Sequence, residues 1–449
     1  MDPVVPSLLQ LCVQKLAQSL IRYGPKKVRF GRLSRLPRRA LEALLDTLVA
    51  KNALNDNVLP HALTRQTRTL GLEGSSQLRR CVLNTIGRSC PNLRVLDVRS
   101  CQQVDNRIVR DVLQYCEHLT TLRLDNCARI SDSAFAPALW KRPLAGLLGL
   151  KELSVGKCGQ ITAEGLMGYV MKGAPHLGTL GLTHCRLAIT DEVASELLFS
   201  FGLEALDLSC CTQITDECFE ARPASLLKEL RVANTPITDA AVEGIAARAA
   251  NLEVFDAGWV IRLSDLGVQA LAEHCTRLRV LCVCNTQITD AAFHAIMRCR
   301  HLERLDASWC TRATSRALGI LAGEDGDGAK RLPLKELVLI GALTLPGGDC
   351  LGSMAVPASP GLWGPPHGKG STSASSSPMP WHWLHRMPPP MLDSLPPLSL
   401  PPTGREPGQT SPGFGHLCAD DAVVGEELPP PALPLLPPAA AQHGSVFGL

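Results

Sequence analysis

Residues Leu203 to Asp216 read Leu-Glu-Ala-Leu-Asp-Leu-Ser-Cys-Cys-Thr-Gln-Ile-Thr-Asp, and this stretch decides the fold. In its first half, apolar and other residues alternate as in a short β-strand with one buried face. The Thr hydroxyl and the Asp carboxylate at its end are typical of the start of a helix. The stretch therefore predicts a strand, a tight turn and a helix.

The strand pattern recurs along most of the chain. The ten segments that follow L-x-x-L-x-L or a close variant begin at Leu93, Leu119, Leu150, Leu177, Leu203, Leu227, Leu252, Leu278, Leu302 and Leu334. Their first leucines are 24 to 32 residues apart, and a degenerate unit over Thr69–Leu72 precedes them. This period is that of leucine-rich repeats. We therefore expect an α/β fold: a right-handed horseshoe solenoid with a parallel concave sheet and convex helices.

Cysteine occupies two fixed places in the repeat. The position three residues after the strand holds either Cys or Thr. A second Cys precedes several of the strands. These ten of the 18 cysteines are Cys101, Cys127, Cys158, Cys185, Cys211 and Cys310, then Cys90, Cys116, Cys275 and Cys299. A small side chain fits a tight turn and can satisfy a backbone group. No C-x-x-C pair has zinc spacing, so we expect free thiols, no metal and no cofactor.

The second half of the repeat predicts where the helices begin. Ile-Thr-Asp or a variant of it ends at Asp132, Asp191, Asp216, Asp239, Asp265 and Asp290. The hydroxyl is expected to cap the helix, and the carboxylate lies at the positive end of its dipole. A convex helix of about ten residues should follow each motif.

Composition divides the chain into three parts: a helical segment over 1–66, the repeats over 67–345 and a tail over 346–449. The last 104 residues hold 22 of the 34 prolines, with Ser and Gly clusters, so we expect this tail to be disordered. With 45 basic and 42 acidic residues, the net charge of +3 does not indicate nucleic acid or a membrane surface as partner. No secretory signal or membrane span is recognised. We expect a reducing compartment, the cytoplasm or also the nucleus.

Two short apolar patterns precede the repeats. Leu8, Cys12 and Leu16 recur every four residues, which places them on one side of a helix. The second pattern begins with Leu36 and Pro37 and continues with spaced apolar residues such as Leu41. Pro37 favours the first turn of a second helix, where its missing N–H costs nothing.

Together these motifs resemble a known family. The repeat, C-x-x-L-x-x-L-x-L-x-x-C-x-x-I-T-D, resembles the cysteine-containing leucine-rich repeats of substrate receptors in cullin-RING ubiquitin ligases. Leu8, Cys12 and Leu16 match the Elongin-binding box, so the resemblance implies that they contact Elongin C of an Elongin B–C adaptor. Leu36, Pro37 and Leu41 resemble the second box, which is directed toward the cullin.

Two other interpretations of residues 7–48 remain open. Both helices could only cover the open end of the solenoid, which every repeat array must cap. Leu36-Pro37 followed by spaced leucines also opens F-boxes, which bind the Skp adaptor. Against an F-box, no Arg-x-Trp-like segment precedes the repeats, and the helix over 7–22 would have no role.

The outward-facing positions of the strands are the expected contacts for a protein substrate. They carry a mixed, mildly acidic set of side chains: Asp97, Arg99, Arg123, Asp125, Glu152, Asp207, Glu229, Arg231, Asp256, Arg304 and Asp306. The recurring Asp could instead form ladders with neighbouring strands. Trp259 and Trp309 each lie two residues past a strand, two repeats apart. Exposed Trp is common at binding hot spots, so we assign both to the substrate site, although each could instead pack on the adjacent turn.

No catalytic constellation is present: no G-x-S-x-G, no Walker loop, no H-E-x-x-H and no Rossmann fingerprint. The sequence therefore predicts a non-enzymatic substrate-recognition subunit, which presents target proteins for ubiquitination and proteasomal degradation. The alternative is a repeat scaffold without a ligase link, such as a regulator of small GTPases or of the cytoskeleton.

Overall fold

A computed structural model describes residues 8–23, 33, 35–136, 145–199, 201–219, 226–323, 332–341 and 354–357. The chain divides into two compact units, Met1–Pro378 and Met379–Leu449, and every described residue belongs to the first. The expected tail over 346–449 lies outside the described residues except for one short strand. No helix in the described ranges combines the length and the apolar character that crossing a bilayer requires.

Twelve strands form one sheet in the order of the sequence. The first eleven pair in parallel, and the twelfth pairs antiparallel with the eleventh. The strands are β1 Thr69–Gly71, β2 Val95–Asp97, β3 Thr121–Arg123, β4 Glu152–Ser154, β5 Thr179–Gly181, β6 Ala205–Asp207, β7 Glu229–Arg231, β8 Val254–Asp256, β9 Val280–Cys282, β10 Arg304–Asp306, β11 Glu336–Leu339 and β12 Met354–Pro357. The predicted strands and their parallel order are confirmed. The expected boundary at 345 leaves out β12.

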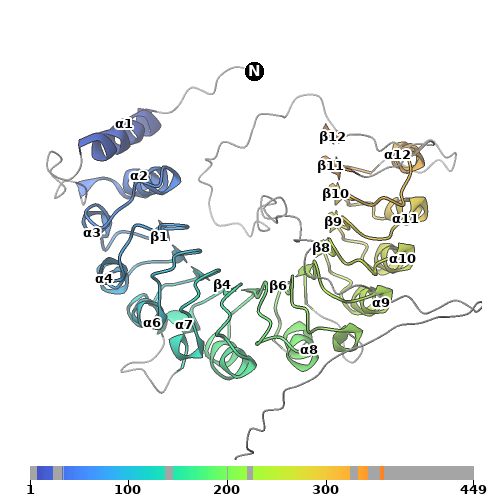
Figure 1. The fold of residues 1–449 in the computed structure, drawn as a ribbon, viewed down its shortest axis with the longest axis horizontal. Coiled ribbons are helices and arrows are strands. Elements are labelled where there is room, and N and C mark those ends of the chain that lie inside the picture. The colour runs from blue at the N-terminus through green and yellow to red at the C-terminus, as the bar shows by residue number, and fades with distance from the viewer. Residues whose placement is uncertain are drawn as a thin grey trace, which may run out of the picture. The chain divides into compact units, whose positions relative to one another are not determined.

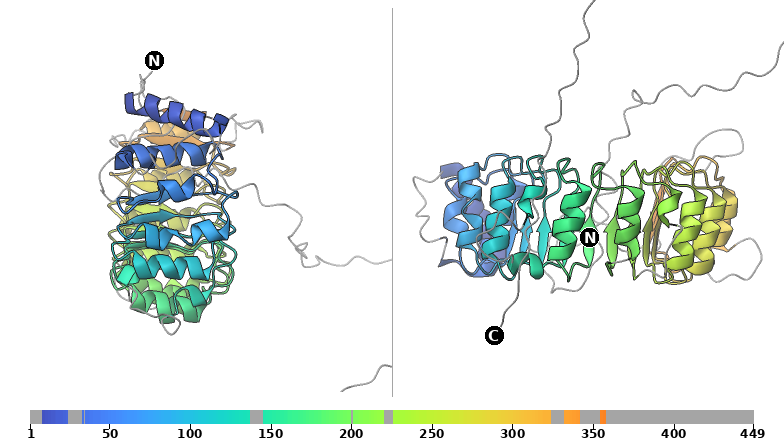
Figure 2. Two further views of the ribbon diagram at one scale, coloured as in Figure 1. Left: turned by 90° about the vertical axis from the view of Figure 1, so that its left-hand side faces the viewer. Right: turned by 90° about the horizontal axis from the view of Figure 1, so that it is seen from below.

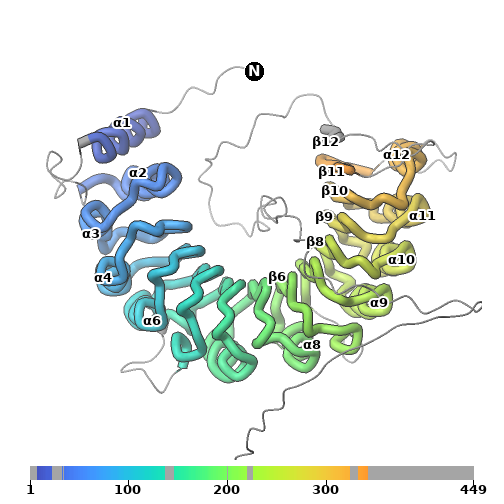
Figure 3. The backbone as a smooth tube through the Cα atoms, viewed as in Figure 1, coloured from blue at the N-terminus to red at the C-terminus, as the bar shows by residue number. Residues whose placement is uncertain are grey.

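Helices line the outer side of the repeat array, and the strands line its inner side (Figure 1). They are α3 Leu59–Ala62, α4 Arg80–Leu83, α5 Ile86–Ser89, α6 Asn106–Tyr115, η2 Asp132–Ala134, α7 Ala145–Leu148, η4 Gly165–Met171, α8 Asp191–Phe199, η5 Asp216–Phe219, α9 Asp239–Arg248, α10 Asp265–His274, α11 Asp290–Ile296 and α12 Arg316–Ala322. Seen from two further sides, they stack in register with the strands (Figure 2). The backbone makes one turn of a coil for each repeat (Figure 3). The predicted solenoid is confirmed.

Two of the expected ten-residue helices are much shorter. The 3₁₀ helices η2 and η5 replace them after Asp132 and Asp216. Pro137 and Pro223 follow shortly in the sequence. A proline inside a helix removes a backbone hydrogen bond and clashes with the preceding turn, so it prevents extension of the helix.

Two helices precede the sheet and cover its first strand. The helix α2 Arg38–Ala50 packs on β1, and α1 Leu8–Tyr23 packs on α2. Val13, Ala17 and Leu20 form the buried side of α1. The buried apolar side chains form one continuous cluster from Val13 to Leu339. The N-terminal helices therefore do cap the solenoid, as one interpretation of the sequence predicts.

The thiols after the strands link each repeat to the one before it. Cys101 Sγ donates to the carbonyl oxygen of Leu72 at 2.9 Å. Cys127, Cys158, Cys185, Cys211 and Cys310 make the same bond at 3.1 to 3.3 Å. Thr235 bonds within its own repeat instead, to the carbonyl of Val232 at 2.6 Å. The prediction that this position satisfies a backbone group is confirmed, and the partner of each thiol is in the preceding repeat.

The aspartates of the Ile-Thr-Asp motif link each repeat to the one after it. Asp239 Oδ1 accepts the backbone N–H of Ser264 at 2.8 Å, and its Oδ2 accepts the Ser264 hydroxyl at 2.6 Å. The same pair of bonds joins Asp132 to Thr162, Asp191 to Thr215, Asp216 to Thr238, Asp265 to Thr289 and Asp290 to Thr314. We call this series the aspartate ladder.

The predicted hydroxyl cap is confirmed at α9, α10 and α11 and is wrong at η2, where the Ser131 side chain makes no cap hydrogen bond. The hydroxyls of Thr238, Ser264 and Thr289 accept the N–H two residues on, at the starts of α9, α10 and α11. Each of these hydroxyls therefore caps its own helix and also donates to the carboxylate of the preceding repeat.

Replacement of Asp239 by Ala tests the aspartate ladder. The variant leaves the N–H and hydroxyl of Ser264 and the N–H of Gly267 without their acceptor. We expect the free energy of unfolding to fall by about 2–3 kcal/mol, since hydrogen bonds to charged groups carry that order of stability. Denaturant titration followed by circular dichroism measures it. Glu243→Ala, which removes an exposed carboxylate from the same helix, is the control. Equal stability of the two variants would refute the role of the ladder.

The reactivity of the thiols tests their placement in the repeat. Burial raises the pKa of Cys101 to about 11 and that of Cys116 and Cys158 to about 12. Cys12 and Cys81 are exposed. Because only the thiolate reacts, iodoacetamide at pH 8 should label Cys12 and Cys81 at least about tenfold faster than the other three. Peptide mass spectrometry measures the rates, and denaturant should remove the difference. Similar rates in the folded protein would contradict the assignment.

Candidate functional site

The side of α1 that faces away from α2 carries exposed apolar side chains. Leu8 is 79% exposed and Leu11 is 41% exposed, and Cys12 is also exposed. Leu16 is only half-buried. A step of four residues turns a helix by about 40° beyond a full turn. Along the series Leu8, Cys12, Leu16 and Leu20, the side chains therefore rotate from the exposed side of α1 to its buried side.

An exposed apolar cluster at the end of a solenoid needs an explanation beyond capping. Capping uses the opposite side of α1, where Val13 and Ala17 are buried. Contiguous exposed apolar side chains are typical of surfaces that bind another protein. We call Leu8, Leu11 and Cys12 the α1 outer face. Two of the three residues predicted to contact an adaptor, Leu8 and Cys12, lie on it.

The three residues predicted to contact a cullin lie at the start of α2. Pro37 is exposed and directly precedes the helix, and its carbonyl accepts the N–H groups of Ala40 and Leu41. Leu36 is half-buried against the core. Leu41 is 3% exposed and packs inside the cluster. Leu41 therefore holds α2 in place and has almost no surface to offer a partner.

The register of the sheet brings the predicted substrate contacts into three columns on the concave side. Asp97, Arg123, Asp207, Arg231, Asp256 and Asp306 share the middle column. Arg99 and Asp125 lie two residues further along their strands. Arg304 lies on the other side of the middle column, in the same column as Glu152 and Glu229.

The charges at the first repeats neutralise one another. Arg99 contacts both oxygens of Asp97 and also Glu73, at 2.6 to 3.0 Å. Arg123 Nε donates to Glu152 at 2.7 Å. Asp125 accepts the Ser154 hydroxyl and the N–H of Gly156. Burial raises the pKa of the Asp125 carboxyl. These side chains form an internally bonded network on the concave surface.

A second charged group lies across β6 to β8. Arg231 pairs with Glu229 on the same strand. Burial raises the pKa of Glu229 and that of Asp256. Since burial disfavours the charged form of these carboxyls, this part of the surface is less acidic than its composition indicates.

Most of the recurring aspartates close the turns that follow the strands. Asp207, Asp256 and Asp306 each accept the N–H two residues ahead, at 2.9 to 3.0 Å. Asp97, Asp256 and Asp306 are also buried. These bonds are within one repeat, whereas Thr183 of the preceding repeat donates to Asp207 at 3.1 Å. The aspartates therefore have a structural role, and direct contact with a substrate stays a prediction for them.

Trp259 and Trp309 occupy one unusual backbone position. Every turn from Ser100 to Trp309 has a left-handed residue there, with φ between 51° and 64°. The other occupants are Ser100, Asn126, Lys157, His184, Cys210, Asn234 and Asn285. The predicted alignment of the two Trp residues, with one repeat between them, is confirmed by the register.

The two indole rings differ in exposure. Trp259 is half-buried, whereas Trp309 is 52% exposed. The Trp309 ring lies against Gly341, where an added Cβ would be 2.5 Å from Cε3. A bulky residue in the left-handed region is an outlier, and such outliers often serve function. The role of both Trp residues in substrate binding stays a prediction.

Two cysteines of the predicted free-thiol set lie together in the concave sheet. Cys282 Sγ and Cys284 Sγ are 3.6 Å apart, and Asp306 completes a buried group of three. The hydrogen bond to Cys284 and burial raise the pKa of the Cys282 thiol. Structural zinc takes four ligands and binds thiolates. The three donors are one fewer than such a site uses.

Comparison with known proteins supports the repeat fold. A family model described as Leucine Rich repeat matches residues 202–217. The BTB/POZ domain-containing protein FBL11 of Arabidopsis thaliana is 22% identical over 249 residues, which are 56% of this chain and 23% of that protein. The chain thus aligns with about a quarter of the length of this curated relative.

Two solved structures are similar in fold. A chain from the crystal structure of the Rad7 and Elc1 complex in yeast has a TM-score of 0.51 and 19% identity, over 77% of this chain and 97% of that one. An internalin (inlF) from Listeria monocytogenes has a TM-score of 0.38 and 14% identity, over 68% and 88% of the two chains. The match to the chain of the Rad7 and Elc1 complex, together with the order of the strands in the sheet, establishes the leucine-rich-repeat solenoid for the described repeats.

Substitution of Trp309 tests whether its ring has a role in packing. Asn already occupies this turn position in three repeats and tolerates the left-handed region. We expect Trp309→Asn to change the free energy of unfolding by less than about 1 kcal/mol, and Trp309→Ala to be less stable than Trp309→Asn. Denaturant titration of both variants measures this. A loss of more than about 2 kcal/mol in both would show that the ring serves packing on Gly341.

Proposed function

We propose that this chain is the substrate-recognition subunit of a cullin-RING ubiquitin ligase. The α1 outer face docks an adaptor of the Elongin C type, and the repeat surface binds a target protein for ubiquitination and proteasomal degradation. The observation that carries the proposal is the exposure of Leu8 and Cys12, one helical turn apart, on a helix whose opposite side is packed.

The geometry of α1 distinguishes docking from capping alone. A cap needs one apolar side, and Val13, Ala17 and Leu20 supply it. A helix that only caps would place polar residues on its outer side, where Leu8, Leu11 and Cys12 lie. A leucine that exposes most of its side chain gains by entering an apolar groove, and full burial contributes about 1.5–3 kcal/mol.

Similarity in fold supports a two-protein arrangement. The Rad7 and Elc1 complex contains a chain that matches this one across most of its length. The assignment of the adaptor to Elongin C with Elongin B rests on the box at Leu8, Cys12 and Leu16. The likeness to FBL11 is distant and covers a small part of that protein.

The start of α2 is the proposed cullin contact. Pro37 is exposed and lies at the N-terminus of a helix that packs beside α1. An adaptor on the α1 outer face and a cullin near Pro37 would therefore bind adjacent surfaces. Leu36 and Leu41 contribute mainly by fixing α2 on the core. The proposed place of action is the cytoplasm or the nucleus.

Binding to purified Elongin B–C tests the proposal with the whole chain. Leu8→Ala combined with Cys12→Ala should weaken the interaction at least about tenfold, because hot-spot side chains dominate such interfaces. Ile21→Ala removes another exposed apolar side chain of α1 and should leave binding unchanged. Isothermal titration calorimetry gives the affinities, and melting temperatures confirm folding.

The same measurement distinguishes the alternatives. Binding of the wild-type chain to the Skp adaptor instead of Elongin B–C would make the N-terminal segment an F-box. Binding to neither adaptor would contradict the ligase role and favour a repeat scaffold without a ligase link.

A further inference from the structure

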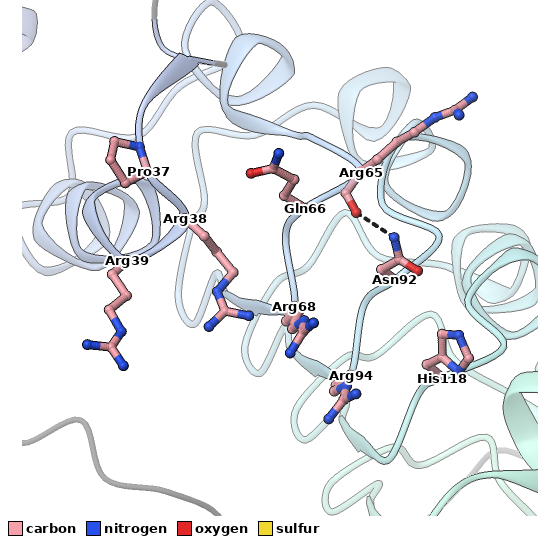
Figure 4. A pocket seen from close by; sticks show the side chains of 9 residues that line it. All are labelled: Pro37, Arg38, Arg39, Arg65, Gln66, Arg68, Asn92, Arg94 and His118. Carbon is pink, nitrogen blue, oxygen red and sulfur yellow. Dashed lines mark hydrogen bonds between the residues drawn. The ribbon is translucent and has the colours of Figure 1, made fainter.

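An open pocket of about 700 Å³ lies between the start of α2 and the edge where β1 and β2 begin. Its lining is strongly basic and includes Arg38, Arg39, Arg65, Arg68, Arg94 and His118. Figure 4 shows Arg38, Arg68 and Arg94 as neighbours along the pocket, whereas Arg65 points away from them. Asn92 Nδ2 donates to the carbonyl oxygen of Arg65 at 2.8 Å and holds this part of the wall together.

The two central arginines are direct neighbours across strands. Arg68 and Arg94 precede β1 and β2, which pair in register from Thr69 and Val95. The N–H of Arg94 donates to the carbonyl oxygen of Arg68 at 2.7 Å. Neighbouring strands are about 4.8 Å apart, and like charges directly opposite each other are destabilising.

One acidic side chain, Glu42, borders these arginines, since its carboxylate accepts the N–H of Thr69, next to Arg68. Within the described ranges, no carboxylate lies within ion-pair distance of Arg39, Arg65, Arg68 or Arg94. Arg38 has one distant partner, Glu42 at 3.9 Å. All of the lining arginines except Arg38 are exposed. The pocket therefore holds a concentration of uncompensated positive charge, in a chain whose net charge is only +3.

The same row of the sheet is neutral at its other end. There, acidic and basic residues alternate in the position just before each strand: Glu204, Lys228, Glu253, Arg279, Glu303 and Lys335. Lys228 pairs with Glu204 at 2.9 Å, and Lys335 pairs with Glu303 at 2.6 Å. Arg279 lies between Glu253 and Glu303 and contacts both. The fold thus supports charge pairing in this row, and the first two repeats depart from it.

The chemistry of the pocket favours a compact, multiply charged anion. Arginine presents a planar fork of N–H donors that matches phosphate oxygens. The row does not continue as an unbroken basic track, because Thr120 and Gly178 on either side of Lys151 are uncharged and the members from Glu204 on are paired. No Phe, Tyr or Trp is among the residues that line the pocket, so the large rings that stack on bases are missing from its lining, which disfavours single-stranded nucleic acid. The volume lies within the usual range of ligand pockets, about 300–1,000 Å³.

We propose that this pocket binds a phosphorylated peptide segment of a target protein. It borders the concave sheet, so a protein that lies along the strands can place a flexible segment at Arg68 and Arg94. The identity of that protein as a ubiquitination substrate rests on the proposed function. The binding event itself requires no adaptor.

Fluorescence anisotropy with the full chain tests the proposal. The probe is a fluorescein-labelled Gly–Ser peptide with two phosphoserines two residues apart, and the same peptide without phosphate is its control. The pocket variant is Arg68→Ala with Arg94→Ala. The matched control is Arg279→Ala with Lys335→Ala, which removes two positive charges from the same row of the sheet.

We expect the wild type to bind the phosphorylated peptide at least about tenfold more tightly than the unmodified one. The pocket variant should lose this preference, and the matched control should keep it. Equal weakening in both variants would mean non-specific attraction and would overturn the proposal. So would tighter binding of an oligouridine or of inositol hexakisphosphate in competition.

The outcome is independent of the adaptor. Leu8→Ala with Cys12→Ala should bind the phosphorylated peptide like the wild type. If peptide binding fails while Elongin B–C binds, only the pocket assignment is wrong. If neither Elongin B–C nor the Skp adaptor binds and the peptide binds, the ligase role is wrong and the pocket remains.

Discussion

The bond between each aspartate of the Ile-Thr-Asp motif and the following Thr or Ser is the interaction on which the rest of the structure depends. A single repeat cannot bury its own apolar face, so it needs neighbours held in register. The aspartate ladder fixes that register at the convex edge, and the thiol bonds fix it near the strands. Where Ala163 replaces the aspartate, the ladder is interrupted and the helix that follows is the π-helix η4.

The parts of the fold that depend on neighbouring residues could be predicted from the sequence, whereas the contacts between stacked repeats could not. The spacing of the leucines predicted the strands, and the hydroxyl before each aspartate predicted the caps. Both are local patterns in the sequence. The aspartate ladder was not predicted, since its partner is about 25 residues away and only stacking brings the two together. The short 3₁₀ helices η2 and η5 stand where the repeat pattern predicts longer helices, and the prolines that follow them in the sequence, Pro137 and Pro223, are not part of that pattern.

The candidate site was predicted less completely, for a physical reason. Sequence alternation shows which side of a strand a residue faces, and it does not show whether that side chain is already bonded. Asp256 and Asp306 face the concave side as expected, yet they are buried and close their own turns. Arg68 and Arg94 were missed because they precede the strands. The sequence did contain a signal for them. In the position just before each strand, the sign of the charge alternates from Glu204 to Lys335, whereas Arg68 and Arg94 have the same sign.

The features proposed to have a function are therefore departures from the repeat: the α1 outer face, the Trp residues at left-handed turns and the basic pocket. The central claim is that an adaptor covers the α1 outer face. Its most direct test is the rate at which iodoacetamide modifies Cys12 in the whole chain, with and without saturating Elongin B–C. Cys81, which is also exposed, is the internal standard. We expect the adaptor to slow the modification of Cys12 at least about tenfold and to leave the rate at Cys81 unchanged. An unchanged rate at Cys12 would contradict it.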